Sequence, residues 1–115
     1  MKRLLARLAL LLTMTPAVFA HAVLLETNPA LNTFVSGPDI VVRLRFNSRV
    51  DAARSRLSLV LPDRTVRPLA LDPQSSPASL NSRLIGLGTG AYRLRWQVLA
   101  ADGHISRGEV PFGIK

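Results

Sequence analysis

The sequence contains no cysteine, and its 115 residues include only two methionines, Met1 and Met14. The absence of cysteine excludes a disulfide framework, a thiolate zinc site, a cysteine nucleophile and a blue-copper centre, because each of these needs a cysteine sulfur. It also excludes a lipid anchor attached through cysteine. Hydrophobic residues make up 48% of the chain and charged residues 19%, a composition typical of a folded protein. At this length we expect one domain with a single modest core.

The first twenty residues have the three parts of a secretory signal peptide. They begin with a basic segment, continue with a short apolar stretch and end with small residues at the positions that a signal peptidase reads. A membrane anchor is the alternative, but the apolar stretch is shorter than the roughly 20 residues that a transmembrane helix needs, and Pro16 interrupts it. The three parts are Lys2, Arg3 and Arg7, then residues 8–12, then residues 17–20.

We therefore expect cleavage after Ala20 and a mature domain of residues 21–115 in the periplasm. Cleavage would remove three of the 15 basic residues, leaving 12 against seven acidic residues and a net charge of +5. Export would separate the protein from the nucleic acids of the cytoplasm, and the low aromatic content of 5% leaves little for bases to stack on. The sequence thus predicts that nucleic acid is not a partner, although the protein is basic.

Apolar and polar residues alternate with a period of two along much of the mature domain, which predicts β-strands buried on one face. Turn-forming pairs such as Asn28-Pro29 separate the alternating segments, and no segment shows a helical stripe. About seven short strands predict an all-β fold, either an antiparallel β-sandwich or a small barrel. The proline, glutamine, serine and alanine content of residues 72–81 predicts a loop. The predicted strands are residues 22–25, 40–46, 57–61, 65–71, 83–87, 92–98 and 110–114.

Arginines occupy the polar positions of two predicted strands. Arg43 and Arg45 alternate with the apolar residues of one strand, and Arg93 and Arg95 with those of another. Alternation alone places polar residues on the outer face, so a solvated basic face is the simpler interpretation. The alternative is a weak attraction to anionic lipid or to an acidic partner.

The mature domain contains two histidines, and the first of them, His21, would be its N-terminal residue. An N-terminal histidine offers its free amine and its ring Nδ1 to one metal ion and closes a six-membered chelate. An internal histidine has no free amine and cannot do this. Both nitrogens can give up protons to a metal near neutral pH, because an α-amine has a pKa of about 8 and an imidazole one of about 6.5.

The second histidine follows the clearest predicted strand, in Asp102-Gly103-His104. Residues two apart in an extended chain point to the same side, so Asp102 and His104 can converge on one ion. With His21 they would supply three nitrogens and one carboxylate oxygen, a set that suits Cu(II), with nickel and zinc as weaker alternatives. Without a thiolate or thioether there is no soft ligand set for Cu(I). The alternative is that Asp102-Gly103 forms a type I′ hairpin turn and His104 is an ordinary surface residue.

The residues around both histidines resemble the CopC family of bacterial periplasmic copper-binding proteins. The N-terminal part is similar in its initial histidine and the Asn-Pro-Ala turn that follows. The middle part resembles the family's strand that ends in Phe-Ser-Glu. The C-terminal part is the most specific, because it follows the family's pattern Gly-x-Tyr-x-Val-x-Trp…Asp-x-His…Gly…Phe. The similar segments are residues 21–24, 28–30, 44–48, 90–98 and 101–104, together with Gly108 and Phe112.

This resemblance implies a Greek-key β-sandwich, cupredoxin-like or immunoglobulin-like, over residues 21–115. It also implies a Cu(II) site formed by His21, Asp102 and His104, and a CopD-like copper permease of the inner membrane as a possible partner. The chain departs from the family in two respects. Members with a second, Cu(I) site carry a methionine-rich loop, whereas residues 21–115 contain no methionine, and Ser48 stands where members often have a glutamate near the copper.

We therefore expect a monomeric periplasmic protein that binds one Cu(II) ion and sequesters or carries it, in copper homeostasis or resistance, without catalysing a reaction. One alternative is a mononuclear copper oxygenase that uses the same N-terminal histidine. The domain is small for that function, and the sequence shows no set of exposed aromatic residues to hold a sugar chain. Another alternative is a structural sandwich domain that pairs with a membrane copper permease, in which case neither histidine would affect metal affinity.

Overall fold

Eight β-strands and one short 3-10 helix make up residues 22–115, the part of the chain that the computed structural model describes. The predicted signal peptide and His21 lie outside this part. Within it, no helix is long and apolar enough to cross a membrane. The elements in chain order are β1 (Leu24–Asn28), β2 (Thr33–Val35), β3 (Ile40–Phe46), η1 (Ala52–Arg54), β4 (Arg56–Val60), β5 (Val66–Leu69), β6 (Ser79–Leu84), β7 (Gly90–Leu99) and β8 (Ile105–Ile114).

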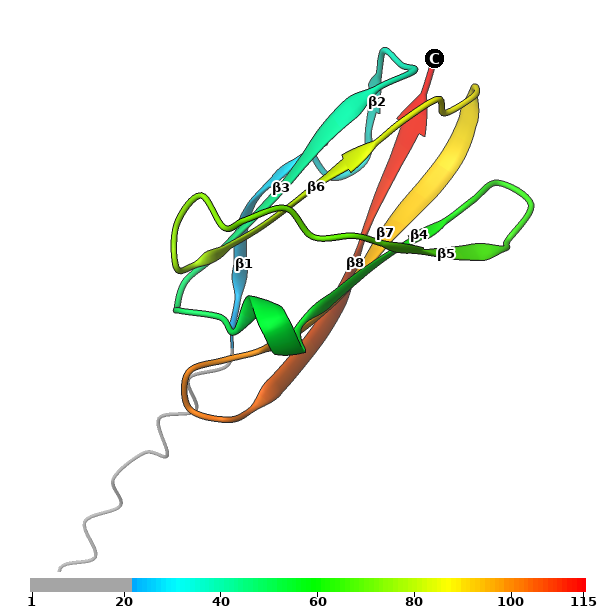
Figure 1. Cartoon of the computed structure of the whole chain (residues 1–115). Helices are drawn as coiled ribbons and strands as arrows, with labels where there is room; N and C mark the ends of the chain where they lie inside the picture. The colour runs from blue at the N-terminus through cyan, green and yellow to red at the C-terminus, as the bar shows by residue number, and fades with distance from the viewer. Residues whose placement is uncertain (1–21) are drawn as a thin grey trace, which may run out of the picture.

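The strands form two sheets, with the order β1-β3-β6 in one and β2-β8-β7-β4-β5 in the other. Every pairing of named strands is antiparallel except that of β2 with β8. Figure 1 shows the two sheets as the layers of a sandwich. Strands that follow one another in the chain often lie in different sheets, as in Greek-key topologies. The expected all-β sandwich is confirmed.

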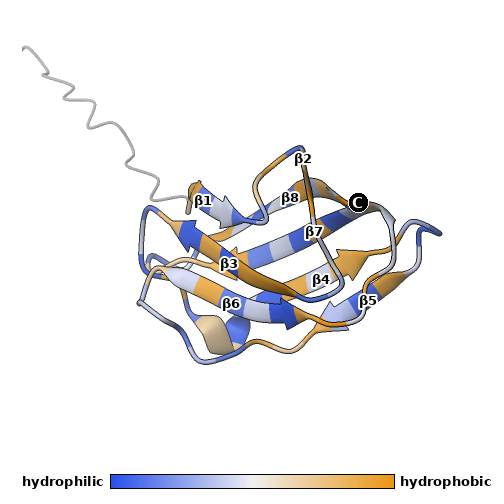
Figure 2. Ribbon diagram, turned by 90° about the horizontal axis from the view of Figure 1, so that it is seen from above, coloured by the Kyte–Doolittle hydropathy of each residue, from blue (hydrophilic) through white to orange (hydrophobic). Residues whose placement is uncertain are grey.

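The core lies between the two sheets and is built from the apolar positions of the alternating strands, as the colours along β3 and β7 indicate (Figure 2). Val42 and Leu44 of β3 and Leu94 of β7 are completely buried. The rings of Phe46 and Trp96 meet edge to face, with their centroids 5.1 Å apart. An edge-to-face aromatic pair adds to the stabilisation from buried area, so this contact fixes the end of β3 against β7 of the other sheet.

The strand predicted at residues 83–87 lies too close to the C-terminus, since the observed strand, β6, occupies Ser79–Leu84. The strand ends where it does because Gly86 adopts a φ of +69°, a left-handed conformation that interrupts an extended chain. The backbone N–H of Gly86 then donates to the Oδ1 of Asp39 at 2.9 Å instead of to a neighbouring strand.

The prediction of a loop throughout residues 72–81 is wrong at both ends, because Asp72 forms a bridge and β6 begins at Ser79. Asp72 and Asn81 form an antiparallel bridge, and Ser79 is completely buried. The hydroxyl of Ser79 donates to the backbone oxygen of Ser76 at 3.0 Å and accepts the backbone N–H of Ser76 at 3.0 Å. These local hydrogen bonds allow a polar residue to enter the core at the start of β6.

Candidate metal centre

Asp102 and Gly103 lie at the tip of the hairpin that joins β7 to β8, and His104 precedes β8. The N–H of Ala100 donates to the backbone oxygen of His104 at 2.9 Å, and the N–H of Gly103 donates back to the oxygen of Ala100 at 2.9 Å. Gly103 has a φ of +87°, which glycine adopts at little steric cost. These contacts close a loop of three residues between Ala100 and His104.

The alternative interpretation of Asp102-Gly103 as a type I′ turn is wrong. A type I′ turn needs a positive φ at both central residues. Within residues 22–115, the only residues other than glycine with a positive φ are Asn32 and Arg64. The loop instead has the form in which a turn is followed by one left-handed glycine.

The carboxylate of Asp102 makes two contacts with His104. Its Oδ1 accepts the backbone N–H of His104 at 3.0 Å, and its Oδ2 lies 2.9 Å from the ring Nδ1. The backbone hydrogen bond first, and the ring hydrogen bond second, hold the pKa of the Asp102 carboxyl below its ordinary value. An ionised carboxylate can only accept, so Nδ1 is the donor of this contact, and Nε2 is the ring nitrogen that a neutral imidazole would offer to a metal ion.

Both side chains are accessible to an ion from solvent, since 53% of the His104 side chain and 28% of the Asp102 side chain are exposed. Within residues 22–115, no group of three or more His, Cys, Asp or Glu side chains could hold a metal. A third side-chain ligand of these types would therefore come from outside that range.

Residues 47–50, which we call the connecting segment, link the N-terminal chain to this hairpin loop. The N–H of Val23 donates to the Oδ1 of Asn47 at 2.8 Å, and the backbone oxygen of Val23 accepts the N–H of Asn47 at 2.9 Å. The backbone oxygen of Arg49 accepts the N–H of Ala101 at 3.1 Å. Figure 1 shows the start of β1 and the β7–β8 loop at the same end of the molecule.

Of the three predicted ligands, the structure brings Asp102 and His104 together, whereas His21 lies outside the described residues. Ala22, directly after His21, is buried, so the chain is anchored in the core at this residue. The connecting segment was not found by sequence reasoning, because the alternation that reveals β3 stops before it. The one signal was Asn47, a residue type whose side chain often pairs with backbone groups.

Ser48 forms no side-chain hydrogen bond with this pair. Its hydroxyl is inaccessible to solvent and has no hydrogen-bond partner among the residues that the structure describes. Ser48, which stands where family members often have a glutamate, therefore supplies neither a charge nor a hydrogen bond to Asp102 or His104.

Comparison with known proteins identifies the family. The CopC domain matches residues 24–115, which is most of the chain. The chain belongs to the CopC domain family. Copper resistance protein C of Xanthomonas campestris pv. juglandis is 29% identical over 107 residues, which cover 86% of this chain and 84% of that protein. Protein YobA of Escherichia coli K12 is 29% identical over 113 residues, which cover 94% and 91%.

Solved structures of this family have the same fold. The crystal structure of CopC from Methylosinus trichosporium OB3b has a TM-score of 0.74 at 26% identity and covers 83% of this chain and 94% of its own. PcoC, a methionine-rich copper resistance protein from Escherichia coli, has a TM-score of 0.65 at 25% identity and covers 84% and 100%. This CopC-family chain differs in composition from that protein, because its only methionines are Met1 and Met14.

Proposed function

We propose that this CopC-family protein is exported to the periplasm, where it binds one Cu(II) ion per chain and sequesters or carries it in copper homeostasis or resistance. Two relatives support a role with copper, because one is named copper resistance protein C and the other is described as a copper resistance protein. Residues 1–20 supply the proposed route of export, with cleavage after Ala20.

The proposed site combines the amine and ring Nδ1 of His21 with the Nε2 of His104 and the carboxylate of Asp102. The observation that carries it is the backbone contact from Val23 through the connecting segment to Ala101. This contact holds the start of the domain at the same end as the hairpin loop, so ligands from the N-terminal chain and from the loop can meet one ion.

The ligand chemistry favours Cu(II). Three nitrogens and one oxygen in a tetragonal arrangement suit that ion, with nickel and zinc as weaker competitors. The contact between the ring Nδ1 of His104 and Asp102 orients the imidazole, as neighbouring carboxylates do for histidine ligands. Each carboxylate oxygen has two lone pairs, so Asp102 can bind copper and still accept from His104. We propose no second site for Cu(I), which prefers sulfur ligands.

Copper is the cargo in this proposal, and no reaction is catalysed. The Asp102–His104 pair lies on an exposed hairpin loop, so an ion can be gained or lost there without opening the core between the sheets. A monomer is sufficient for this function. A CopD-like copper permease of the inner membrane is the proposed partner that receives or supplies the ion.

A competitive Cu(II) titration of the protein that begins at His21 tests the ligand assignment. We expect His104→Ala to weaken Cu(II) binding by about 100-fold or more, because the substitution removes an imidazole that binds the ion directly. We expect Asp102→Asn to weaken it by about 10- to 100-fold, because the charge is lost and the imidazole is less well oriented.

Asp63→Asn is the matched control. Asp63 lies in the turn between β4 and β5, and its Oδ1 accepts the backbone N–H of Thr65 at 3.0 Å, as Asp102 does with His104. The substitution disturbs the same kind of turn without removing a proposed ligand, so Cu(II) affinity should not change. Equal affinities of the His104→Ala and Asp63→Asn proteins would contradict the proposed site.

A further inference from the structure

The outer face of the five-stranded sheet carries a cluster of arginines. Directly paired residues project from the same face of a sheet, and so do residues two apart along a strand. Gln97 of β7 pairs with a residue of β4 on one side and a residue of β8 on the other, and both partners are arginines. Two further arginines follow at alternate positions of β7. The cluster consists of Arg56, Arg93, Arg95 and Arg107.

One carboxylate lies among these four guanidinium groups and pairs with two of them. Glu109 of β8 pairs with Arg95 at 2.8 Å and with Arg93 at 3.2 Å. At the outward positions of the five described strands it is the only acidic residue, so this face has a net charge of +3. The hydrogen bond from Arg95, with a smaller contribution from Arg93, holds the pKa of the Glu109 carboxyl below its ordinary value. The carboxylate therefore stays ionised, and the excess positive charge remains.

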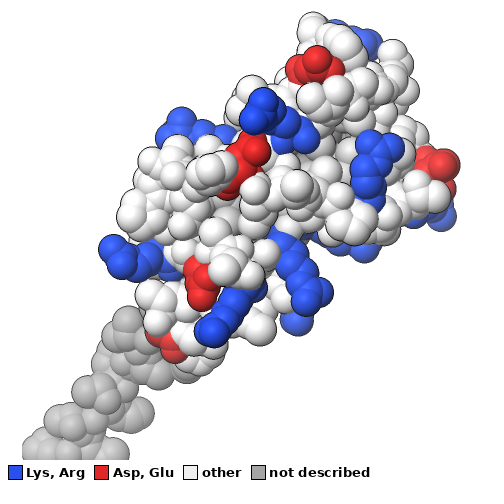
Figure 3. All heavy atoms as spheres, viewed as in Figure 1, with Lys and Arg blue, Asp and Glu red and all other residues white. Residues whose placement is uncertain are grey.

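The outer face of the other sheet is closer to neutral. There Arg45 pairs with Glu26 at 2.7 Å, and Arg83 pairs with Asp72 at 3.2 Å, which leaves Arg43 as the excess charge. Figure 3 shows acidic side chains among the basic ones on the surface that faces the viewer. The excess charge is thus concentrated on the five-stranded sheet.

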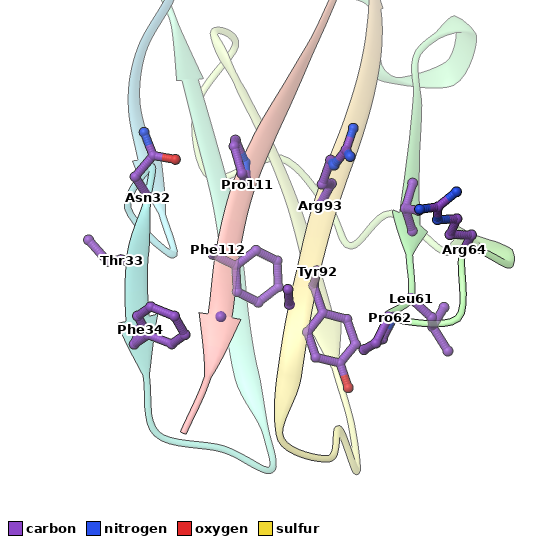
Figure 4. Close-up of a pocket in the computed structure, with 13 residues that line it drawn as sticks. Asn32, Thr33, Phe34, Leu61, Pro62, Arg64, Tyr92, Arg93, Pro111 and Phe112 are labelled. Carbon is purple, nitrogen blue, oxygen red and sulfur yellow. The ribbon is translucent and has the colours of Figure 1, made fainter.

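The outer face of the five-stranded sheet carries exposed apolar residues at the end that lies away from the hairpin loop. Phe34 of β2 is 68% exposed, and its ring lies over Gly113 of β8, where a Cβ would overlap it. A shallow groove runs from Phe34 across β8 and β7 to Pro62, and its lining combines apolar residues such as Ala91 with two arginines. Figure 4 shows Phe34 and Pro62 on opposite sides of these strands. Val66 of β5, which is half exposed, extends the apolar area.

We propose that this face docks on a bilayer that contains anionic lipid, with the arginine cluster against the headgroup phosphates and Phe34 at the boundary with the acyl chains. Guanidinium groups pair well with phosphate, and an apolar side chain beside a basic surface is the pattern of proteins that lie on membranes. All these side chains project from one sheet face, so one bilayer surface can contact them together. This goes beyond the proposed copper binding and requires no metal.

Docking on this face would also position the hairpin loop that carries Asp102 and precedes His104. Arg107 is three residues from His104, so the basic half of the face adjoins the β7–β8 loop, whereas Phe34 lies toward the opposite end. A docked protein therefore holds the hairpin loop near the bilayer surface without burying it.

Co-sedimentation of the metal-free protein with vesicles tests the proposal. The protein that begins at His21 should bind vesicles of phosphatidylcholine and phosphatidylglycerol and should not bind phosphatidylcholine alone. Binding should disappear at about 1 M salt, where the Debye length falls to about 3 Å. Equal binding to both vesicle types, or none to the anionic vesicles at low salt, would overturn the proposal.

A matched pair of triple variants separates this face from the general attraction of a basic protein. Each guanidinium near an anionic surface strengthens association about fivefold, so replacing three of the cluster by glutamine should weaken vesicle binding about a hundredfold. The matched variant loses the same net charge elsewhere and should lose less than about tenfold. Equal losses would overturn the proposal. The variants are Arg56→Gln/Arg95→Gln/Arg107→Gln and Arg43→Gln/Arg54→Gln/Arg83→Gln.

Two further variants keep the test independent of folding and of the copper site. Glu109→Gln removes the one carboxylate of the face and should raise affinity for anionic vesicles about fivefold, a gain that misfolding does not produce. A loss of binding by this folded variant would contradict the proposal. His104→Ala should bind vesicles like the unaltered protein, so failure of the copper proposal and failure of membrane docking give different results.

Discussion

At the scale of single residues, Trp96 and Gly108 show how closely the two central strands are fitted. The two residues pair directly in the β7–β8 ladder. A Cβ at Gly108 would overlap the indole ring of Trp96, which is nine-tenths buried and also contacts Phe46. The indole therefore occupies the volume that any other residue at position 108 would need.

We predict that Gly108→Ala destabilises the protein by about 1–3 kcal/mol, the usual cost of overpacking a core. Gly88→Ala is the control, because no atom lies within 4 Å of the position its Cβ would take and its φ is not in the left-handed region. This control should be neutral or stabilising by up to about 1 kcal/mol. Urea unfolding followed by tryptophan fluorescence measures both, and equal stabilities would show that the indole does not fill that space.

The candidate site was predictable from the sequence only where a residue type has a strong chemical preference. His104 and Asp102 could be identified because their spacing places two metal-binding groups together, and the structure confirms their contact. The connecting segment could not be found in this way. Its role depends on backbone hydrogen bonds of Asn47 and Arg49 to segments 24 and 52 residues away, which no local pattern encodes.

At the scale of elements, strands with clear alternation were predictable, whereas β8 was predicted only over its second half and β2 was not predicted at all. β3 and β7 follow the alternation closely, because one face of each strand is packed in the core. β2 has only three residues and lies in the sheet through its parallel pairing with β8, so it shows too little alternation to be recognised. The predicted strand at residues 83–87 missed most of β6, because Ser79 and Ser82 of β6 are buried polar residues. Their hydroxyl groups form hydrogen bonds that the sequence does not reveal.

The β7–β8 hairpin gives a prediction for the dependence of stability on pH. The pKa of Glu109 is lowered in the folded protein, chiefly by the hydrogen bond from Arg95. Its ionised form therefore stabilises the fold above the ordinary value of 4.5, and this contribution is lost as the pH falls through the lower folded value. We expect Glu109→Gln to be less stable at neutral pH by less than about 1 kcal/mol, as for exposed ion pairs.

Urea unfolding of both proteins at a series of pH values checks this expectation. The difference in free energy of unfolding should shrink as the solution is made more acidic and should vanish below the folded pKa of Glu109. Comparison with the variant removes the contributions of Glu26, Asp63 and Asp102, whose pKa values are also lowered. A difference that stays constant with pH would show that Glu109 acts through packing and not through its charge.

At the scale of the whole molecule, backbone hydrogen bonds hold the chain at Val23 and the β7–β8 hairpin loop at one end of the sandwich, where the proposed metal site lies outside the closed core. Cu(II) bound by the folded state alone should therefore stabilise the whole domain. With free copper at about 100 times the dissociation constant, the expected gain is about 2.7 kcal/mol, or a rise in Tm of roughly 10–20 °C. A chelator such as EDTA should reverse the rise, and His104→Ala should abolish it. A rise that persists in His104→Ala would contradict the site.

The most direct test of the copper site is a competitive Cu(II) titration of two forms of the protein. One begins at His21 with a free amine, and the other carries a single extra residue before it. We predict that the extended form loses affinity by about 100-fold or more, because the amine can no longer close the chelate with the ring Nδ1. Equal affinity of the two forms would contradict the account, since the N-terminal amine would then not be a ligand.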